Sequence, residues 1–468
     1  MLFSSMTFLF VFMPLVMAVY FLSKKEIRNY VLLIASIIFY AWGEPRYLAI
    51  MIITILVNYA GAILLDKHYS SRQRLWIVSL TIVLDLSFLF YFKYFNFVVD
   101  NINGVLATDF QLLDVIMPIG ISFYTFQAMS YLIDVYRREV PAQKDVYKLA
   151  LYIVLFPQLV AGPIVKYHDV CEQIDNRTIE FKNVIIGFKR FITGLAKKVL
   201  IANTLAEVVD KIFAQAPENL TTGVSWLGAV AYCLQLYYDF SGYSDMAIGL
   251  GLMFGFRFLE NFNYPYISKS ITEFWRRWHI SLATWFKLYL YIPLGGNRKG
   301  AVRTYWNLFA VFLVTGIWHG AAWSYVAWGI WNGIFIVIER FFGLDKDKND
   351  RWYVGAAKHV YAFFAIVWGM IIFRAESLSY AYEYICRMLH IDVTKHLPDY
   401  DYGVNNKFAI MLIVGLICAM PVCRNLIYIK YERKVQRTLV NIWLFLLFFW
   451  STISLAASTY NPFIYFRF

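Results

Sequence analysis

The sequence predicts an all-α protein that crosses a membrane many times, and three observations support this prediction. Hydrophobic residues make up 60% of the 468 residues and charged residues only 16%, so a soluble chain would expose too much apolar surface to stay in solution. Apolar runs of about 17–22 residues recur, the length that a helix needs to cross hydrocarbon. Short basic clusters separate these runs, as is typical of orientation signals in membrane proteins.

Charge and cysteine usage argue against two other classes of protein. The net charge of +12 could indicate a nucleic-acid partner, but the lysines and arginines fall in short clusters between apolar segments, so nucleic acid is not expected. The five cysteines are scattered without paired spacing, so no disulfide framework is expected. Residues 1–6 lack the positively charged n-region of a signal peptide, so no cleavable signal peptide is expected either.

Roughly eleven membrane segments are expected, and some of them should not cross fully. They come from twelve apolar stretches, some of which count only as partial: 7–22, 30–42, 46–65, 75–99, 112–133, 147–165, 224–258, two within 304–340, and one each at 357–373, 408–426 and 439–457. Basic residues follow the first segment, so that end should face the cytoplasm, with the N-terminus outside a cytoplasmic membrane. The C-terminal tail, 458–468, should also lie outside. We expect one membrane-embedded domain over residues 1–468.

Three segments depart from a plain membrane-spanning helix. Pro118 and Gly120 lie within 112–133, and because proline removes a backbone donor, a broken or re-entrant segment is expected there. Segment 147–165 ends in PQLVAGP (157–163), and such breaks are tolerated where the backbone lines a cavity or is covered by protein. Residues 182–200 mix basic and apolar positions, which predicts an amphipathic helix at the cytoplasmic interface.

The residues best suited to chemistry lie between 239 and 333. Within this core, residues 272–289 are expected to form one helix, whose aromatic face includes His279. An ionisable group inside a membrane favours a functional role, whereas in a soluble protein such a histidine is usually a hydrogen-bonded core residue. The aromatic face recurs at three- and four-residue steps and consists of Trp275, Trp278, His279, Leu282, Trp285 and Phe286.

His319 is the second candidate. It lies between Trp318 and Gly320, at the expected turn of an apolar hairpin over 304–340. Small residues after it allow a helix or a ligand to approach closely. The unperturbed pKa of imidazole lies near neutrality and burial lowers it, so a neutral imidazole here would be a good general base for a hydroxyl.

Other chemistries are less well supported. Metal sites usually need three or four convergent ligands, and only two histidines are well placed, so no metal is expected. His390 and His396 lie in a polar loop and should be solvated. The sequence has no Walker loop, nucleophile elbow or dinucleotide fingerprint. Asp239 and Asp245 could bind an ion in a transporter, but we favour helix capping and polar networking.

Several motifs together resemble the membrane-bound O-acyltransferase family, in particular its alginate and peptidoglycan O-acetyltransferase branch. The motifs are FWRRWHISL (274–282), YIPLGGNR (291–298), GIWHGAAW (316–323), PQLVAGP (157–163) and YYDFSGYSD (237–245). Their order matches the family, and the resemblance covers nearly the whole chain. The sequence also resembles the teichoic-acid D-alanyl transferase, which is related to that branch.

The resemblance implies a fold, a donor and two catalytic residues. The fold would be a ring of helices around a central tunnel, with re-entrant and interfacial helices. The donor would be a cytoplasmic acyl thioester, expected to be acetyl-CoA, with no bound cofactor. His319 corresponds to the near-invariant histidine and would take the proton of an acceptor hydroxyl. His279 would orient the thioester or its developing oxyanion.

Further site candidates follow from the same resemblance. Cationic side chains suit the phosphates of the donor, and the candidates are Arg276, Arg277, Lys287, Arg298 and Lys299. The tunnel-lining candidates are Trp278, Trp318, Asp239, Ser241 and Asn332. Asn332 departs from the family pattern, in which histidine often occupies this position, so an essential role for it is in doubt.

The C-terminal sequence FIYFRF (463–468) resembles the aromatic tail of the small partner peptide in teichoic-acid D-alanylation. Tyr465 carries a hydroxyl that could accept the acyl group as an intermediate. Alternatively, the tail is an aromatic anchor at the membrane interface.

The function implied is O-acetylation of an exported cell-envelope or secreted polysaccharide. The expected partners are membrane lipid, the polysaccharide acceptor and an SGNH-hydrolase-like acetyltransferase. The rival hypotheses are a polysaccharide or ion transporter without acyl transfer, although no inverted repeat supports one, and a catalytically silent scaffold. The sequence does not identify the acceptor polymer.

Overall fold

The computed structural model describes residues 1–67, 70–160, 162–344, 351–390, 400–423, 434–458 and 460–462. Over these residues the secondary structure is helical, without a strand, as predicted. The chain divides into two compact units, one of Met1–Phe191 with Tyr243–Leu259 and the other of Ile192–Gly242 with Glu260–Phe468. Each unit is described on its own.

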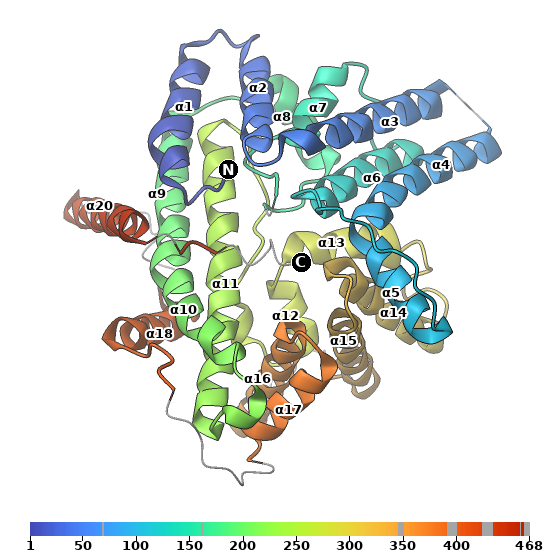
Figure 1. Cartoon of the computed structure of the whole chain (residues 1–468). Coiled ribbons are helices and arrows are strands. Elements are labelled where there is room, and N and C mark those ends of the chain that lie inside the picture. The colour runs from blue at the N-terminus through green and yellow to red at the C-terminus, as the bar shows by residue number, and fades with distance from the viewer. Residues whose placement is uncertain are drawn as a thin grey trace. The chain divides into compact units, whose positions relative to one another are not determined.

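The first unit contains the N-terminal helices. They are η1 (Phe8–Phe12), α1 (Met13–Leu22), α2 (Arg28–Ala41), η2 (Pro45–Tyr47), α3 (Leu48–Lys67), α4 (Ser71–Leu89), η3 (Phe90–Tyr94), α5 (Phe95–Leu106), α6 (Ile121–Arg137), α7 (Val146–Val154) and α8 (Tyr167–Asn176). Helices α3, α4 and α6 pack together (Figure 1). Buried Asn58 on α3 donates to Asp85 on α4 at 2.9 Å, so a polar pair links these two apolar helices.

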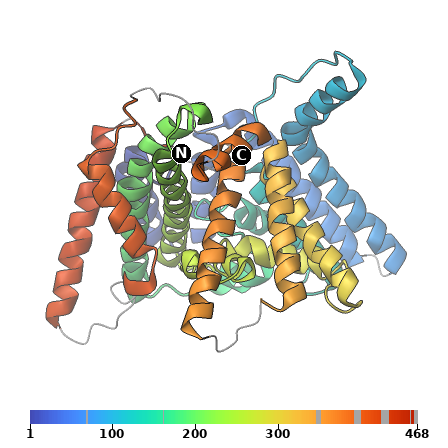
Figure 2. The ribbon, with the colours of Figure 1, turned by 90° about the horizontal axis from the view of Figure 1, so that it is seen from below.

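The second unit carries the residues singled out for chemistry. Its helices are η4 (Lys197–Ala202), α10 (Asn203–Phe213), η5 (Pro217–Asn219), η6 (Pro265–Ile267), α12 (Ile271–Arg277), α13 (Ile280–Phe286), η7 (Lys287–Tyr291), α14 (Ala301–His319), α15 (Trp323–Phe342), α16 (Trp352–Arg374), α17 (Leu378–Met388), α18 (Asn406–Cys418), η8 (Pro421–Cys423) and α20 (Lys434–Ala457). Two long helices contribute residues to both units: α9 (Phe181–Ala196) and α11 (Thr222–Met253). Within the second unit, α15 packs against both α14 and α16 (Figure 2).

Several helices have the length and composition of membrane spans. Among the described residues, four are long and apolar enough to cross a bilayer: Pro45–Lys67, Ser71–Leu106, Trp352–Arg374 and Thr438–Ala457. Three shorter apolar helices are Phe8–Leu22, Arg28–Ala41 and Asn406–Cys418. The count of roughly eleven segments stays a prediction.

Both expected helix breaks are present. Helix α6 begins only at Ile121, because Pro118 cannot contribute a backbone donor and Gly120 takes a left-handed φ of 76° at the N-cap. Helix α7 ends at Val154, and the described part of the following PQLVAGP motif contains no helix. Prolines and glycines therefore mark these helix boundaries correctly.

The expectation of an interfacial amphipathic helix over 182–200 is wrong from Arg190 onward. Arg190 is 8% exposed and Lys198 only 2% exposed. In the first unit, Arg190 pairs with Asp245 at 2.8 Å. In the second unit, Lys198 pairs with Asp239 at 2.6 Å. These basic residues neutralise buried carboxylates instead of facing a lipid surface.

The preferred capping role for Asp239 and Asp245 is also wrong. Both lie inside α11, which runs without interruption for 32 residues, and helix caps lie at helix ends. The polar networking expected for them is confirmed by their ion pairs with Lys198 and Arg190.

Candidate active site

The expected single helix over 272–289 is two short helices with a break at Trp278 and His279. Helix α12 ends at Arg277 and α13 begins at Ile280. Between them His279 has φ 46° and ψ 53°, a left-handed conformation that a residue with a Cβ adopts only at a cost. The aromatic periodicity predicted the helical residues correctly but gave no sign of the break.

A neighbouring stretch of chain holds this break in place. The backbone N–H of Asn263 donates to the Arg277 carbonyl at 2.9 Å, and that of Ile280 donates to the Asn261 carbonyl at 2.9 Å. The side-chain oxygen of Asn261 accepts from the Ser281 backbone N–H at 3.2 Å, which satisfies a donor at the start of α13. The loop after α11 therefore fixes the conformation in which His279 is presented.

His279 is 1% exposed and lies edge-on to Phe240 of α11, with ring centroids 4.6 Å apart. Its Nδ1 contacts the side-chain oxygen of Asn261 at 3.2 Å. Its Nε2 has no hydrogen-bond partner among the described residues. The residue lies outside the apolar helices named above as membrane spans, and burial lowers its pKa, with a further lowering by His319.

The α14–α15 hairpin has the form that the sequence predicted, and His319 is the last residue of α14. The two helices approach closely at Gly316 and Gly329, where a Cβ on Gly329 would lie 2.6 Å from the carbonyl oxygen of Phe312. The ring of Tyr325 covers Gly320. Small residues therefore permit the tight turn that follows His319.

Aromatic rings surround the His319 imidazole, which is 7% exposed. Trp318 and Trp328 each lie 5.0 Å away between ring centroids, and Phe373 of α16 lies 5.2 Å away. Trp328 and Phe373 meet it edge-on, at 90° and 86°. The surroundings of the His319 imidazole are therefore largely aromatic and apolar.

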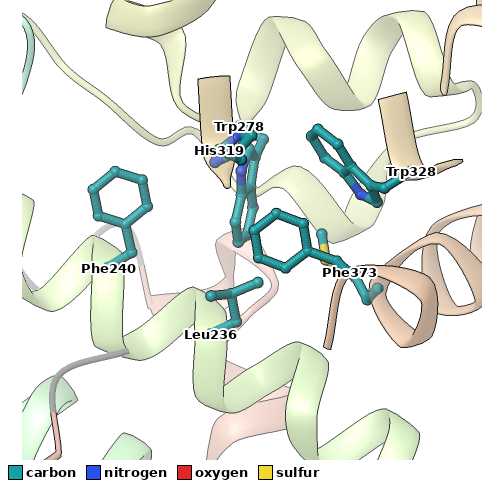
Figure 3. A pocket seen from close by; sticks show the side chains of 7 residues that line it. Leu236, Phe240, Trp278, His319, Trp328 and Phe373 are labelled. Atoms are coloured by element: carbon teal, nitrogen blue, oxygen red, sulfur yellow. The ribbon is translucent and has the colours of Figure 1, made fainter. Parts of the chain in front are cut away.

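A pocket opens beside His319. Its empty space, including the side open to its surroundings, is about 330 Å³. Figure 3 shows Phe240, Trp278, Trp328 and Phe373 around it, with His319 among them. The lining residues are Leu236, Phe240, Trp278, His319, Trp328, Met370 and Phe373. An apolar pocket with one imidazole suits general-base chemistry on a hydroxyl.

The tunnel-lining candidates lie in different surroundings. Trp278 lines the pocket, and Trp318 packs directly against His319. Asp239 pairs with Lys198, and Ser241 is buried on the same helix. Asn332 accepts a hydrogen bond from the Trp275 indole at 3.0 Å, so it links α15 to α12.

The donor-binding candidates are mostly exposed. Arg276, Lys287, Arg298 and Lys299 are exposed to solvent or to a ligand. Arg277 pairs with Glu273 at 2.8 Å one turn earlier in α12. The described residues contain no group of three or more metal-ligating side chains.

Tyr465 and the rest of FIYFRF lie outside the described residues. The residues just before this sequence belong to the second unit and contact its helices η4 and α10. Tyr460 donates to Asp210 at 2.6 Å, Asn203 donates to Asn461 at 3.1 Å, and Lys198 donates to the Pro462 carbonyl. Lys198 also pairs with Asp239, the neighbour of the pocket residue Phe240.

Some site residues could not be identified from the sequence. Met370 and Phe373 are ordinary apolar residues of an apolar helix, and nothing in their pattern marks them. Asn261 did carry a signal, since it is a polar residue in the aromatic sequence that follows a long apolar helix. Its partners, His279 and Ser281, are set by the fold.

The chain is similar to several known proteins. Residues 37–375 match the model of MBOAT, the membrane-bound O-acyltransferase family. The chain is 43% identical to a protein of Pseudomonas putida named probable alginate O-acetylase AlgI, over 100% of both chains. It is 32% identical to a peptidoglycan O-acetyltransferase of Helicobacter pylori, over 93% of this chain and 89% of the relative.

A teichoic acid D-alanyltransferase of Bacillus subtilis is 28% identical over 55% of this chain and 69% of its own length. The family match covers most of the chain and includes both histidines of the site. Together with the apolar helices, it makes the protein a multi-pass membrane enzyme that transfers acyl groups to oxygen. The chain belongs to the membrane-bound O-acyltransferase family.

Proposed function

We propose that this enzyme takes an acetyl group from a cytoplasmic thioester and moves it across the membrane for O-acetylation of an exported cell-envelope or secreted polysaccharide. The names of the relatives support a polysaccharide acceptor, since they include alginate O-acetylases and a peptidoglycan O-acetyltransferase. The observation that supports acyl transfer best is the pocket that places His319 among aromatic rings, with His279 buried near it.

In the proposed reaction, the His319 imidazole removes the proton from the acceptor hydroxyl. The hydroxyl oxygen attacks the thioester carbonyl carbon and forms the new C–O bond. The C–S bond then breaks, and the leaving thiolate takes the proton from the His319 imidazolium. The products are an O-acyl ester and a free thiol. General-base catalysis contributes about 10²–10⁴-fold in rate, so positioning in the pocket supplies much of the remainder.

The thioester is proposed to be acetyl-CoA, which is a substrate here and not a bound cofactor. Its phosphates need cationic partners, and Arg276, Lys287, Arg298 and Lys299 are exposed and available for this. Arg277 is already paired with Glu273 and would contribute less. On this proposal the YIPLGGNR loop belongs to the cytoplasmic side of the enzyme.

Tyr465 is proposed to relay the acetyl group. Its phenol oxygen would attack the thioester as the first acceptor, and the tyrosyl ester would then pass the acetyl group to a partner outside. The contacts of Tyr460, Asn461 and Pro462 with the second unit support this proposal, because they hold the start of the tail on the unit that contains His319. Mass spectrometry should find acetyl-Tyr465, and full activity in Tyr465→Phe would exclude the relay.

An SGNH-hydrolase-like acetyltransferase is proposed as the partner that delivers the acetyl group to the glycan. The enzyme would lie in the cytoplasmic membrane with both termini outside. A polysaccharide transporter is less well supported, because the family transfers acyl groups.

The test is ester-linked acetate on envelope and secreted glycans of cells that express the wild type or His319→Ala at equal level. We expect acetate to be lost in the variant while polymer export continues. His390→Ala is the matched control, since His390 is exposed and its Nδ1 lies 3.1 Å from the hydroxyl of Thr222. Unchanged acetate with altered export would instead support a transporter.

A further inference from the structure

The hydrogen bonds around Asn261 determine which nitrogen of His279 carries a proton. A backbone N–H can only donate, so the Asn261 atom that faces the Ser281 N–H is the amide oxygen. The Ser281 hydroxyl donates to the same oxygen at 2.9 Å. The 3.2 Å contact of this oxygen with Nδ1 of His279 is therefore a bond in which Nδ1 donates. His279 carries its proton on Nδ1.

The other nitrogen, Nε2, is then an unprotonated acceptor. It is buried and has no hydrogen-bond partner among the described residues. Leaving a buried acceptor unsatisfied costs free energy, so a buried acceptor in a native protein that no protein group satisfies usually accepts a hydrogen bond from water or a ligand. A neutral imidazole in this state accepts a hydrogen bond at Nε2 and has no proton there to donate to an oxyanion.

The charged and titratable groups around His279 favour this neutral form. Phe240 packs against it from α11, and Asn261 and Ser281 are uncharged. The titratable neighbour is His319 of α14, whose positive form would oppose a second positive charge. The adjacent acid on α11, Asp239, is paired with Lys198 at 2.6 Å.

We propose that Asn261 is a positioning residue, which fixes His279 with its proton on Nδ1 and presents Nε2 as an acceptor to an N–H or O–H group of a bound substrate. The inference rests on the proposed acyl transfer and sharpens the role of His279, which orients a substrate and does not stabilise the oxyanion. The group that binds Nε2 is either an amide N–H of the thioester donor or a hydroxyl of the acceptor.

Two substitutions of Asn261 test this role in the full-length protein in lipid nanodiscs, with acetyl-CoA, the proposed acetyltransferase partner and a soluble oligosaccharide, and with thiol release as the measured rate. Asn261→Asp keeps an acceptor for Nδ1 but adds a negative charge, which favours the imidazolium. The acidic limb of kcat/KM should therefore move to higher pH by about one unit or more. Asn261→Leu removes the anchor and should lower kcat/KM by about 10-fold or more.

The Michaelis constants distinguish the two sources of the N–H or O–H group. A higher KM for acetyl-CoA in Asn261→Leu assigns the Nε2 bond to the donor, and a lower kcat with an unchanged KM for acetyl-CoA assigns it to the acceptor hydroxyl. Ser281→Ala is the graded control, because it removes one of the three bonds to the Asn261 oxygen and should cost only a few-fold. An unmoved pH profile in Asn261→Asp, or higher activity of that variant at neutral pH, would overturn the proposal.

A direct measurement on the wild type separates this inference from the proposed function. The chain has seven histidines, so ¹⁵N-histidine labelling gives a small set of imidazole signals, and comparison with His279→Gln assigns those of His279. We expect a protonated Nδ1 and an unprotonated Nε2 at neutral pH. If the wild type transfers no acetyl group but shows this tautomer, only the proposed function fails. A proton on Nε2 in place of Nδ1 would overturn the role of Asn261.

Discussion

The two histidines of the site lie on regions that differ in how their conformation is fixed. His319 ends α14 of a helical hairpin whose close contacts are local, between neighbouring helices joined by a short turn. His279 lies in a left-handed break between α12 and α13, held by Asn261 from a separate loop. A local sequence pattern can therefore specify the hairpin that carries His319, whereas the break that carries His279 depends on a contact between distant parts of the chain.

The largest expected effect on stability comes from Glu339, which joins these regions. Its buried carboxylate on α15 accepts the backbone N–H groups of Ile271 and Thr272 at the start of α12. Glu339→Ala should destabilise the protein by about 3 kcal/mol, because it leaves buried donors unsatisfied. Glu339→Gln, which retains one oxygen, should lose less. Thermal unfolding in detergent measures the stability of both variants. Equal melting temperatures for Glu339→Ala and the wild type would contradict the proposed stabilising role of Glu339.

The close approach of α14 and α15 predicts the next effect. Gly329→Ala places a methyl group against the Phe312 carbonyl oxygen and should cost about 1–3 kcal/mol through overpacking. Gly223→Ala is the matched control, since a Cβ there meets nothing within 4 Å and Gly223 lies in α11. The control should be neutral or slightly stabilising. A tolerated Gly329→Ala would mean that the hairpin is less tightly packed than described.

Asn332 tests a smaller contact between the two regions. It accepts from the Trp275 indole at 3.0 Å, and its loss in Asn332→Leu should cost about 1–2 kcal/mol. Trp275→Phe removes the same bond from the other side, so the double variant should lose less than the sum of the two single variants. Strict additivity would show that the bond contributes nothing.

The smallest effect concerns the backbone at His279. Glycine adopts a φ of 46° without the steric cost that a Cβ imposes, so His279→Gly should be more stable than His279→Ala by about 1 kcal/mol. Both variants lack the imidazole and should transfer acetate poorly. An equal stability of the two variants would indicate that the left-handed conformation relaxes when the imidazole is lost.

Sequence patterns predicted the fold class, the two expected helix breaks and the α14–α15 hairpin, because apolar periodicity, proline and glycine act locally. The break at His279 escaped prediction, since its left-handed residue is not glycine and Asn261 stabilises it from another loop. The prediction that Lys198 lies at the membrane interface failed for a similar reason. A lysine on an amphipathic helix indicates an interface, and only the fold reveals that it faces Asp239 inside the protein.

Of the predicted site residues, Trp278 and His319 line the pocket, and His279 packs against the pocket residue Phe240; their roles in catalysis stay predictions. The remaining pocket residues, such as Met370 and Phe373, come from α16 and carry no local mark of function. The family resemblance implied a tunnel for acyl transfer but did not indicate that these residues line the pocket. The pocket forms only when helices α11, α14, α15 and α16 pack together, so the sequence pattern of any one helix does not predict it.

The most direct test uses purified protein in proteoliposomes with labelled acetyl-CoA, the proposed acetyltransferase partner and an oligosaccharide acceptor. Release of free thiol and formation of the labelled ester are measured together for the wild type and His319→Ala. We expect coupled thiol release and ester formation in the wild type, and a rate about 10²–10⁴-fold lower in the variant. Equal rates in the two proteins would contradict the assignment of His319 as the base.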